Sequence, residues 1–230
     1  MKKFTLASFN IGACSKMFGR YDEKDLFAVA DLIRSVGADV IALQEVDRGC
    51  ARSGGVDMAA VIARRAGYRY RHFITIRPFQ GGRYGTAILS RFPILKRKTI
   101  NYKVEVAKQG TSCGYVVLDV DGVAVTVFNT HLSCESEAAN LDTMRCLDGI
   151  LSSYGRPFLC CGDFNTSPAV VSAHVGGVRL ANKDLHTYAD VSIDNVLYTK
   201  GISVSDVHTV DATTVPVSDH NVLVCKVNVK

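Results

Sequence analysis

The chain has 230 residues, of which 47% are hydrophobic and 21% are charged, as in an ordinary soluble globular protein with a sizeable core. This length fits one large domain better than two small ones, so we predict a single domain over residues 1–230. No apolar run approaches the roughly 20 residues that a membrane-spanning helix needs, which excludes a transmembrane segment of that kind.

The net charge is +5, and the positive charge is unevenly distributed. Between Arg48 and Lys98 there are twelve Lys or Arg residues and a single acid, Asp57. Clustered positive charge attracts anionic ligands, so this stretch is either a solvated basic face or a rim that attracts phosphate. It does not by itself indicate nucleic acid.

The start of the chain and its cysteines bear on location. Met1-Lys2-Lys3 is compatible with an export signal, but Ser8, Asn10 and Gly12 interrupt the apolar stretch early. We therefore predict a cytoplasmic protein, with an export signal already removed as the alternative. The eight cysteines include no Cys-x-x-Cys pair, so reduced, buried thiols are expected rather than a zinc knuckle or a redox motif.

The spacing of apolar residues predicts both strands and helices. The run 39–46 is apolar on both faces, as in a central strand covered on two sides, and it delivers Glu45 at its end. Helices are expected over 25–36 and 56–66, each ended by a glycine, and a short helix plus loop over 169–191. Further strands are expected over 4–9, 69–76, 84–90, 94–102, 115–120, 123–130, 157–161, 193–198 and 220–227, with Pro78, Gly81-Gly82 and Pro93 as separators.

Two of these segments have more specific patterns. Asp121-Gly122 is a strong hairpin turn pair between the strands over 115–120 and 123–130. A helix over 137–151 is expected to bury one broad apolar face, formed by Ala138, Leu141, Met144, Leu147, Ile150 and Leu151. Because strands occur both consecutively and between helices, and many are apolar on both faces, we predict one α/β domain with two stacked sheets covered by helices.

Polar side chains mark the ends of these strands. Four of them fall at the C-terminal ends of predicted strands, and three stand at or just before strand beginnings: Asn10, Glu45, His131 and Asp163 in the first group, Asp194, Asp219 and His220 in the second. If the two groups of strands run in opposite directions, all seven meet at one rim. Each position also has an ordinary explanation as a strand boundary, and Gly162-Asp163-Phe164-Asn165 is the usual punctuation of a turn.

The residue types at this rim suit one chemistry. Carboxylates together with the neutral oxygens of Asn10 and Asn165 suit Mg²⁺, which keeps several waters and binds a substrate phosphate. Zinc would need more His or Cys ligands, and calcium a denser carboxylate cage. His131 and His220 can carry charge beside a phosphorane-like transition state, and Asp194 can fix the tautomer of His220.

At this point the chain resembles the endonuclease/exonuclease/phosphatase superfamily of metal-dependent phosphoesterases. The matching segments come in the family's order and span residues 8 to 220: Ser8-Phe9-Asn10, Leu43-Gln44-Glu45, Asn129-Thr130-His131-Leu132, Gly162-Asp163-Phe164-Asn165, Ile193-Asp194-Asn195-Val196 and Ser218-Asp219-His220. Each segment is weak alone, but the ordered set is highly specific. The fold that the resemblance implies is DNase I-like, a four-layer α/β/β/α sandwich of two mixed sheets flanked by helices.

The resemblance also implies a metal site. Glu45 would be the main Mg²⁺ ligand, with Asn10 and Asp219 completing or supporting the site, and Mn²⁺ is a possible substitute for Mg²⁺. The metal would lower the pKa of a bound water and neutralise developing charge.

The remaining residues would act on the reacting groups. By the same resemblance, Asp163 would orient or deprotonate the attacking water, and Asn165 would hold that water or a phosphoryl oxygen. His220, held by Asp194, would be a base or a stabiliser of the transition state, and His131 would donate to a phosphoryl oxygen. Whether Asp163 or His220 takes the proton stays open.

Departures from the known branches limit the choice of substrate. The chain has no Trp, so it lacks the Trp-containing segment of apurinic-site endonucleases and the Pro-x-Trp-x-Asp-Arg motif of inositol polyphosphate 5-phosphatases. Secreted sphingomyelinases are generally longer and carry signal peptides. A loosely defined group of small, mostly bacterial phosphohydrolases is most similar, through residues 45–48, 52–54 and 81–91. Arg48, Arg52, Arg83 and Tyr84 are therefore candidates to bind a substrate phosphate or head group, with a solvated surface as the alternative.

Three functions remain open at this stage. We predict a monomeric Mg²⁺-dependent phosphodiesterase or phosphatase acting on a small or lipid-linked phosphate ester. A nuclease is the alternative, supported mainly by the basic stretch, and its binding to nucleic acid would weaken steeply with salt. A non-catalytic binding module on the same fold is the third, and the intact set of polar residues argues against it.

Overall fold

The structure is a computed structural model that describes residues 1–15, 21–102, 104, 107, 111–213 and 218–230. Its strands are β1 (Lys2–Asn10), β2 (Val40–Arg48), β3 (Tyr70–Phe79), β4 (Gly82–Ser90), β5 (Ile94–Tyr102), β6 (Thr111–Val120), β7 (Val123–His131), β8 (Phe158–Asp163), β9 (Arg179–Leu180), β10 (Asp194–Tyr198), β11 (Ile202–Val210) and β12 (Val222–Val229). The helices are α1 (Glu23–Val36), α2 (Met58–Ala66), α3 (Glu137–Ser152) and α4 (Pro168–His174), with short 3₁₀ turns over Gly12–Cys14 and Ala51–Ser53.

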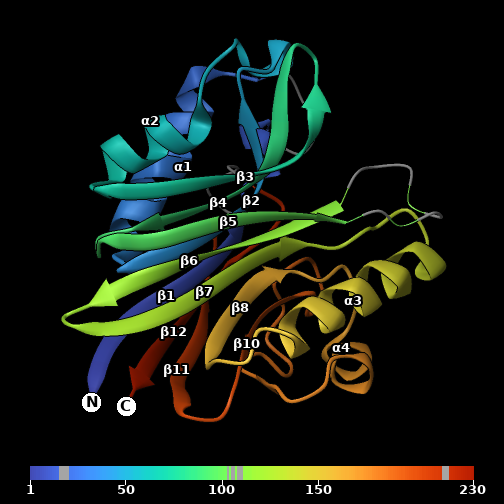
Figure 1. Ribbon diagram of the computed structural model, residues 1–230. Helices are drawn as coiled ribbons and strands as arrows, with labels where there is room; N and C mark the ends of the chain where they lie inside the picture. The colour runs from blue at the N-terminus through green and yellow to red at the C-terminus, as the bar shows by residue number, and fades with distance from the viewer. Residues whose placement is uncertain (16–20, 103, 105–106, 108–110, 214–217) are drawn as a thin grey trace.

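The strands form two six-stranded sheets. One has the order β11-β12-β1-β2-β4-β3 and the other β5-β6-β7-β8-β10-β9. Both are mixed, since β1 pairs with β2 and β7 with β8 in parallel, while the other pairs are antiparallel. Figure 1 shows α1 and α2 beside the first sheet and α3 and α4 beside the second. The predicted α/β/β/α sandwich is confirmed.

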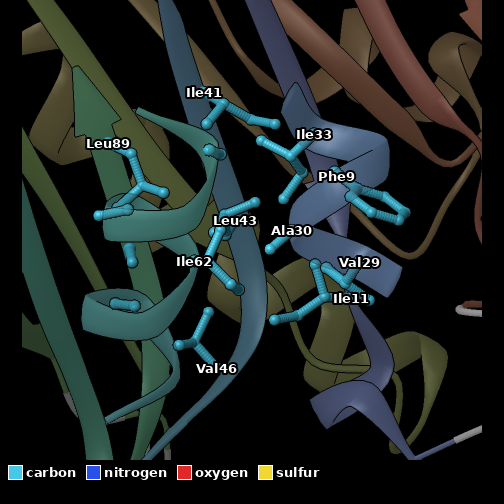
Figure 2. Packing of buried hydrophobic residues seen from close by; sticks show 14 of the residues in the cluster. Phe9, Ile11, Val29, Ala30, Ile33, Ile41, Leu43, Val46, Ile62 and Leu89 are labelled. Atoms are coloured by element: carbon cyan, nitrogen blue, oxygen red, sulfur yellow. The ribbon is translucent and has the colours of Figure 1, made fainter. Parts of the chain in front are cut away.

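Three apolar layers hold the sandwich together. Strand β2 contributes to two of these layers. Its residues Ile41 and Leu43 pack toward α1 and α2, while Val40 and Ala42 pack toward the other sheet. Figure 2 shows the first of these layers, with Ile33 of α1 against the sheet. The third layer lies between the second sheet and α3. Two buried faces on one strand account for its continuous apolar run.

A buried network of polar side chains joins the two sheets between β2 and β7. Gln44 Nε2 on β2 donates to Asn129 Oδ1 on β7 at 2.8 Å, and Asn129 Nδ2 donates to the carbonyls of Leu43 and Ala87 at 3.0 and 2.9 Å. Ser8 Oγ on β1 accepts from Gln44 Nε2 at 3.3 Å. These hydrogen bonds fix the position of β7 relative to β2 immediately before both strands reach the site.

Several element boundaries differ from the sequence prediction. Strand β2 does not end at Glu45 but continues to Arg48 through a bulge, where the register with β4 shifts between Leu43 and Val46. Pro78 does not separate two strands, because β3 is an edge strand that tolerates a missing N–H, and Pro78 pairs with Arg83.

Helix α3 buries much of the expected face, with Met144, Leu147 and Leu151 buried and Ile150 partly buried, but the buried face also includes polar residues. Ala138 is exposed, whereas Asn140 and Thr143 are buried with Met144 and Leu147. Asn140 Nδ2 donates to the carbonyls of Ser133 and Phe164, so a polar side chain turns inward to hold two loops. Strand β11 was not predicted. Among the described residues, no helix combines the length and apolar character needed to cross a bilayer.

Candidate active site

Asp163 lies at the centre of a cluster of polar side chains that also includes Asn10, Glu45, His131 and His220. It is the last residue of β8 and is 1% exposed. Its Oδ2 accepts from Asn10 Nδ2 at 3.0 Å and lies 3.6 Å from His131 Nε2 and 3.7 Å from His220 Nε2. Gly162 allows this approach, because a Cβ at that position would lie 2.6 Å from the Thr130 carbonyl oxygen. Four chain segments thus converge on one carboxylate.

Glu45 reaches the cluster through the bulge in β2. Its backbone has a φ of 55°, in the left-handed region that glutamate seldom occupies. Asn10 Nδ2 donates to Glu45 Oε1 at 3.2 Å, and Asn10 Oδ1 accepts from the Gly12 backbone N–H at 3.0 Å. The amide group of Asn10 therefore faces both carboxylates with its nitrogen and supports them, while its oxygen is directed at the backbone.

His220 is held by a second carboxylate. Its Nδ1 lies 2.8 Å from Asp194 Oδ2, and both side chains are buried. Strand β10 runs antiparallel to β8 and brings Asp194 opposite Asp163. Thr187 Oγ1 accepts from the backbone N–H of Asp194 at 3.0 Å, and the Tyr188 ring packs against the His220 ring with centroids 4.9 Å apart.

Protonation of this pair follows from its surroundings. Burial by itself lowers the pKa of His220, but the hydrogen bond to Asp194 and the charges of Asp194, Asp163 and Asp219 outweigh it and raise the pKa to about 9. Burial and the charge of Asp163 raise the pKa of Asp194 to about 6, although its hydrogen bond with His220 opposes this. At neutral pH the metal-free pair is thus imidazolium and carboxylate.

Asp219 and Asn165 are the two remaining predicted metal or catalytic residues. Ser218 Oγ donates to the Asn10 carbonyl at 2.6 Å, and a Cβ on Gly12 would lie 3.8 Å from Asp219 Oδ1, so Asp219 is beside the end of β1. Asn165 has a φ of 51° and is not extended, so it does not project parallel to Asp163. Its backbone N–H donates to Asp163 Oδ1 at 2.8 Å, and its Nδ2 donates to the Leu132 carbonyl at 2.9 Å.

The donor set fits a hard divalent cation. Glu45 is half-buried beside Asn10 and Asp163, and no Lys or Arg in the described part of the chain forms an ion pair with either carboxylate, which favours a cation there. Asp163, Asp194 and His220 also offer ligand atoms within 4.8 Å of one another. In this second group the hydrogen bond to Asp194 already occupies His220 Nδ1.

The four predicted substrate-binding residues separate in space. Tyr84 is near the centre, since the charges of Glu45 and Asp163 add to burial in raising the pKa of its phenol. Arg52 lies over the Tyr84 ring but is paired through Nε and Nη2 with the buried carboxylate of Asp47, at 2.7 and 2.9 Å. This ion pair gives Arg52 a structural role in addition to any contact with a ligand.

Arg48 and Arg83 lie elsewhere. Arg48 Nε is 3.4 Å from Asp57 Oδ2, and its guanidinium lies over the Phe73 ring. Both arginines line a hollow of about 430 Å³ beside Gly49, and Tyr84 is not among its lining residues. The structure therefore places Tyr84 and Arg52 near the centre but does not bring Arg48 and Arg83 there.

Sequence reasoning missed several residues at the site. Arg77 lies over the Tyr84 ring at 5.4 Å, because a bulge in β3 between Thr75 and Arg77 changes the alternation of its side chains. Thr187, Tyr188 and Asn140 act through the contacts described above. These residues come from loops or from a helix face whose apolar spacing carries no signal of a site.

Comparisons with known proteins agree with this geometry. Residues 7–220 match the model of the Endonuclease/Exonuclease/phosphatase family. A search of curated protein sequences finds no match. The fold is similar to an endonuclease/exonuclease/phosphatase from Beutenbergia cavernae DSM 12333, with a TM-score of 0.81 and 19% identity over 100% of this chain and 72% of that one.

Two further solved structures have the same fold. One is the mannosyl-6-phosphatase Bt3783 of Bacteroides thetaiotaomicron, with a TM-score of 0.72 and 15% identity over 98% of this chain and 99% of that one. The other is sphingomyelinase C from Streptomyces griseocarneus, with a TM-score of 0.73 and 18% identity over 99% and 100% of the two chains. Given the match over residues 7–220, the chain belongs to the endonuclease/exonuclease/phosphatase family.

Proposed function

We propose that this protein is a Mg²⁺-dependent phosphoester hydrolase, a phosphodiesterase or phosphatase that directs a water at a phosphate ester. The observation that carries the proposal is the convergence on Asp163 Oδ2 of Asn10 Nδ2, His131 Nε2 and His220 Nε2, at 3.0, 3.6 and 3.7 Å. One carboxylate among three nitrogen groups, with Glu45 beside it, is suited to hold a water next to a phosphoryl group.

The metal would be held by Glu45 and Asp219, with Asn10 orienting Glu45 through its amide nitrogen. A bound divalent cation supplies charge neutralisation and a more acidic water. Mg²⁺ is proposed over Zn²⁺ because the nearby donors are oxygens, and Mn²⁺ is expected to substitute for it.

The protein groups have separate tasks in this proposal. Asp163 orients the attacking water and accepts its proton. His131 and His220 donate from Nε2 to the phosphoryl oxygens as negative charge develops on them. Asp194 accepts a hydrogen bond from His220 Nδ1 and stabilises the imidazolium, whose protonated Nε2 faces the reaction. Tyr84 and Arg77 are candidates to contact the remainder of the substrate.

A substrate panel tests the proposal. The purified protein is assayed on p-nitrophenyl phosphate, bis(p-nitrophenyl) phosphate, sugar phosphates, sphingomyelin and single- and double-stranded DNA and RNA, each with Mg²⁺, Mn²⁺, Zn²⁺ or EDTA. We expect hydrolysis of at least one ester with Mg²⁺ and Mn²⁺, and none with EDTA. A folded protein that hydrolyses none of these with any metal would favour a binding module instead.

A further inference from the structure

A groove lined by positively charged side chains lies away from the candidate active site, at one edge of the sandwich. Strands β3 and β5 are the edge strands of the two sheets and meet there, with Thr99 Oγ1 3.5 Å from His72 Nε2. Between them is a groove of about 730 Å³. Six basic side chains line it: Arg48, Arg69, Arg71, Lys96, Arg97 and Lys98. Asp57 is the one acid among the described residues that line it.

The groove is separate from the cluster around Asp163. Arg71 pairs with Leu89 of β4, and Leu89 with Ile41 of β2, which is four residues before Glu45. At about 3.3 Å per residue and about 4.8 Å per strand, Arg71 and Glu45 are about 16 Å apart in the sheet, and Arg48, at the near end of the groove, is about 10 Å from Glu45 along β2. The groove also opens at the sheet edge, whereas Asp163 and His131 lie at strand ends.

The positive charges of the groove are largely uncompensated within the protein. Arg71, Lys96 and Lys98 are exposed and form no ion pair with another residue that the structure describes. Among the acids that the structure describes, only Asp57 pairs with one of the six, Arg48. Like charges held close together repel one another, so an external anion that spans both strands lowers the electrostatic energy of this edge.

We propose that this groove binds single-stranded nucleic acid through its phosphate backbone. A concave cationic track with aromatic rings is the feature that single-strand binding sites share. Two half-buried rings line the groove, and each is covered by an arginine: Arg69 lies over Tyr70 at 5.7 Å, and Arg48 over Phe73 at 5.8 Å. Arginine planes stacked in this way offer both a phosphate fork and a surface for bases.

The shape and composition of the groove favour this ligand over two others. A membrane surface is flat and cannot enter a groove, and the exposed Leu95 is a single side chain for insertion among many charges. An acidic protein segment would match the charge, but its carboxylates do not use the two arginine planes that lie over Tyr70 and Phe73, whereas bases can stack on them. The proposal concerns binding, and it does not require that the bound strand is cut.

The test is binding of a fluorescein-labelled dT20 oligonucleotide, measured by fluorescence anisotropy in EDTA at several salt concentrations. EDTA separates this experiment from the proposed hydrolysis, which could fail while binding is retained. With four to six phosphate contacts, the slope of log K against log salt is expected to be about −3 to −4 for a single strand.

Two double variants with the same change of charge distinguish the groove from the overall charge. Arg71→Glu/Lys96→Glu alters exposed residues on the two walls and is expected to weaken binding at least tenfold and to reduce the salt slope. Lys24→Glu/Arg64→Glu alters exposed residues on α1 and α2 outside the groove and is expected to weaken binding less than threefold. Thermal unfolding checks that both remain folded, and Arg71→Ala/Lys96→Ala repeats the test with a milder change.

Three results would overturn the proposal. The first is no binding of dT20 by the wild-type protein at 50 mM salt. The second is an equal loss in both double variants, which would indicate non-specific attraction. The third is groove-dependent binding to vesicles that contain phosphatidylserine without binding to dT20, which would assign the groove to an anionic lipid surface.

Discussion

Glu45 occupies a backbone conformation that costs energy. A non-glycine residue with φ near 55° is typically destabilised by about 1–3 kcal/mol and persists only where its surroundings determine it. Here the bulge in β2 and the hydrogen bond from Asn10 hold it, and the result is a carboxylate directed at the Asp163 cluster. The proposed metal-binding role accounts for why this conformation is retained.

Replacing Glu45 with Gln tests that role without removing volume. We expect Glu45→Gln to weaken Mg²⁺ binding at least tenfold, because a neutral amide oxygen replaces a charged ligand. Isothermal titration calorimetry with MgCl₂ measures this independently of turnover. Glu137→Gln, on an exposed position of α3, is the matched control and is expected to leave binding unchanged. Equal Mg²⁺ affinity in wild type and Glu45→Gln would exclude Glu45 as the ligand.

The protonation of His220 gives a second check at this scale. Because Asp194 and its neighbours raise the pKa of His220 from 6.5 to about 9, the metal-free protein carries an imidazolium at neutral pH. The stability that the raised pKa of His220 contributes is fully present below pH 6.5 and is lost as the pH rises through about 9. An NMR titration in EDTA should show His220 titrating well above 6.5, and Asp194→Asn should lower its pKa. A wild-type value at or below 6.5 would contradict the charged pair.

At the scale of elements, two polar residues of the sequence motifs join the sheets instead of taking part in chemistry. Gln44 and Asn129 are fully buried and hydrogen-bond to each other between β2 and β7. Each stands two residues or fewer before a proposed site residue, Glu45 and His131. The motifs therefore combine a site residue with the residue that positions its strand.

Removing this network should destabilise the fold. Asn129→Ala removes the hydrogen bonds to the Leu43 and Ala87 carbonyls and leaves Gln44 Nε2 with Ser8 Oγ alone, and we expect a loss of about 3 kcal/mol or more in the free energy of unfolding. Urea denaturation measures it. Asn101→Ala, on an exposed position of β5, should change stability by about 0.5 kcal/mol or less. A loss below 1 kcal/mol for Asn129→Ala would show that the network does not hold the sheets.

Most strands and helices were predictable from the sequence, because buried strands and amphipathic helices follow simple periodicities. Strand β11 was not, because it is an edge strand in which polar, partly exposed residues alternate with single apolar ones, and a bulge near Asp206 interrupts that alternation. The bulge at Glu45 was hidden for a related reason. A single extra residue does not interrupt an apolar run, so β2 appeared to end where it bends.

The candidate site was predictable to a similar degree. Strand ends brought Asp163, His131 and Asp194 to one place, as parallel and antiparallel pairing requires. The separation of Arg48 from Tyr84 was not predictable, because it depends on the register of β2 against β4, which the bulge shifts so that Asp47, and not Arg48, lies opposite Tyr84. The sequence shows that positive charge is dense between Arg48 and Lys98, but only the fold shows that much of it lines the groove between β3 and β5.

At the scale of the whole molecule, burial determines the behaviour of the cysteines. All eight are free; six are buried, Cys146 is half-buried and Cys134 is exposed. Burial raises the pKa of the Cys113 and Cys225 thiols to about 12, and it also raises those of Cys160 and Cys161. Thiols in such positions are inert, because the thiolate is the reactive form.

Thiol labelling with DTNB tests this distribution. We expect Cys134 to react first in the native protein, Cys146 more slowly, and the other six only after denaturation. Cys134→Ser should remove the fast phase. Fewer than eight reactive thiols after denaturation without reductant would reveal a disulfide, and several fast native thiols would contradict the buried positions.

The central claim is that the cluster around Asp163 hydrolyses phosphate esters with a divalent metal. The most direct measurement is kcat/KM for the best substrate of the panel at saturating Mg²⁺, compared between wild type and Asp163→Asn with both proteins shown to be folded. We expect Mg²⁺-dependent turnover by the wild type and a decrease of about 100-fold or more in the variant, since a positioned acid–base group typically contributes 10²–10⁴-fold. Wild-type turnover that Asp163→Asn retains, or that persists in EDTA, would contradict the account.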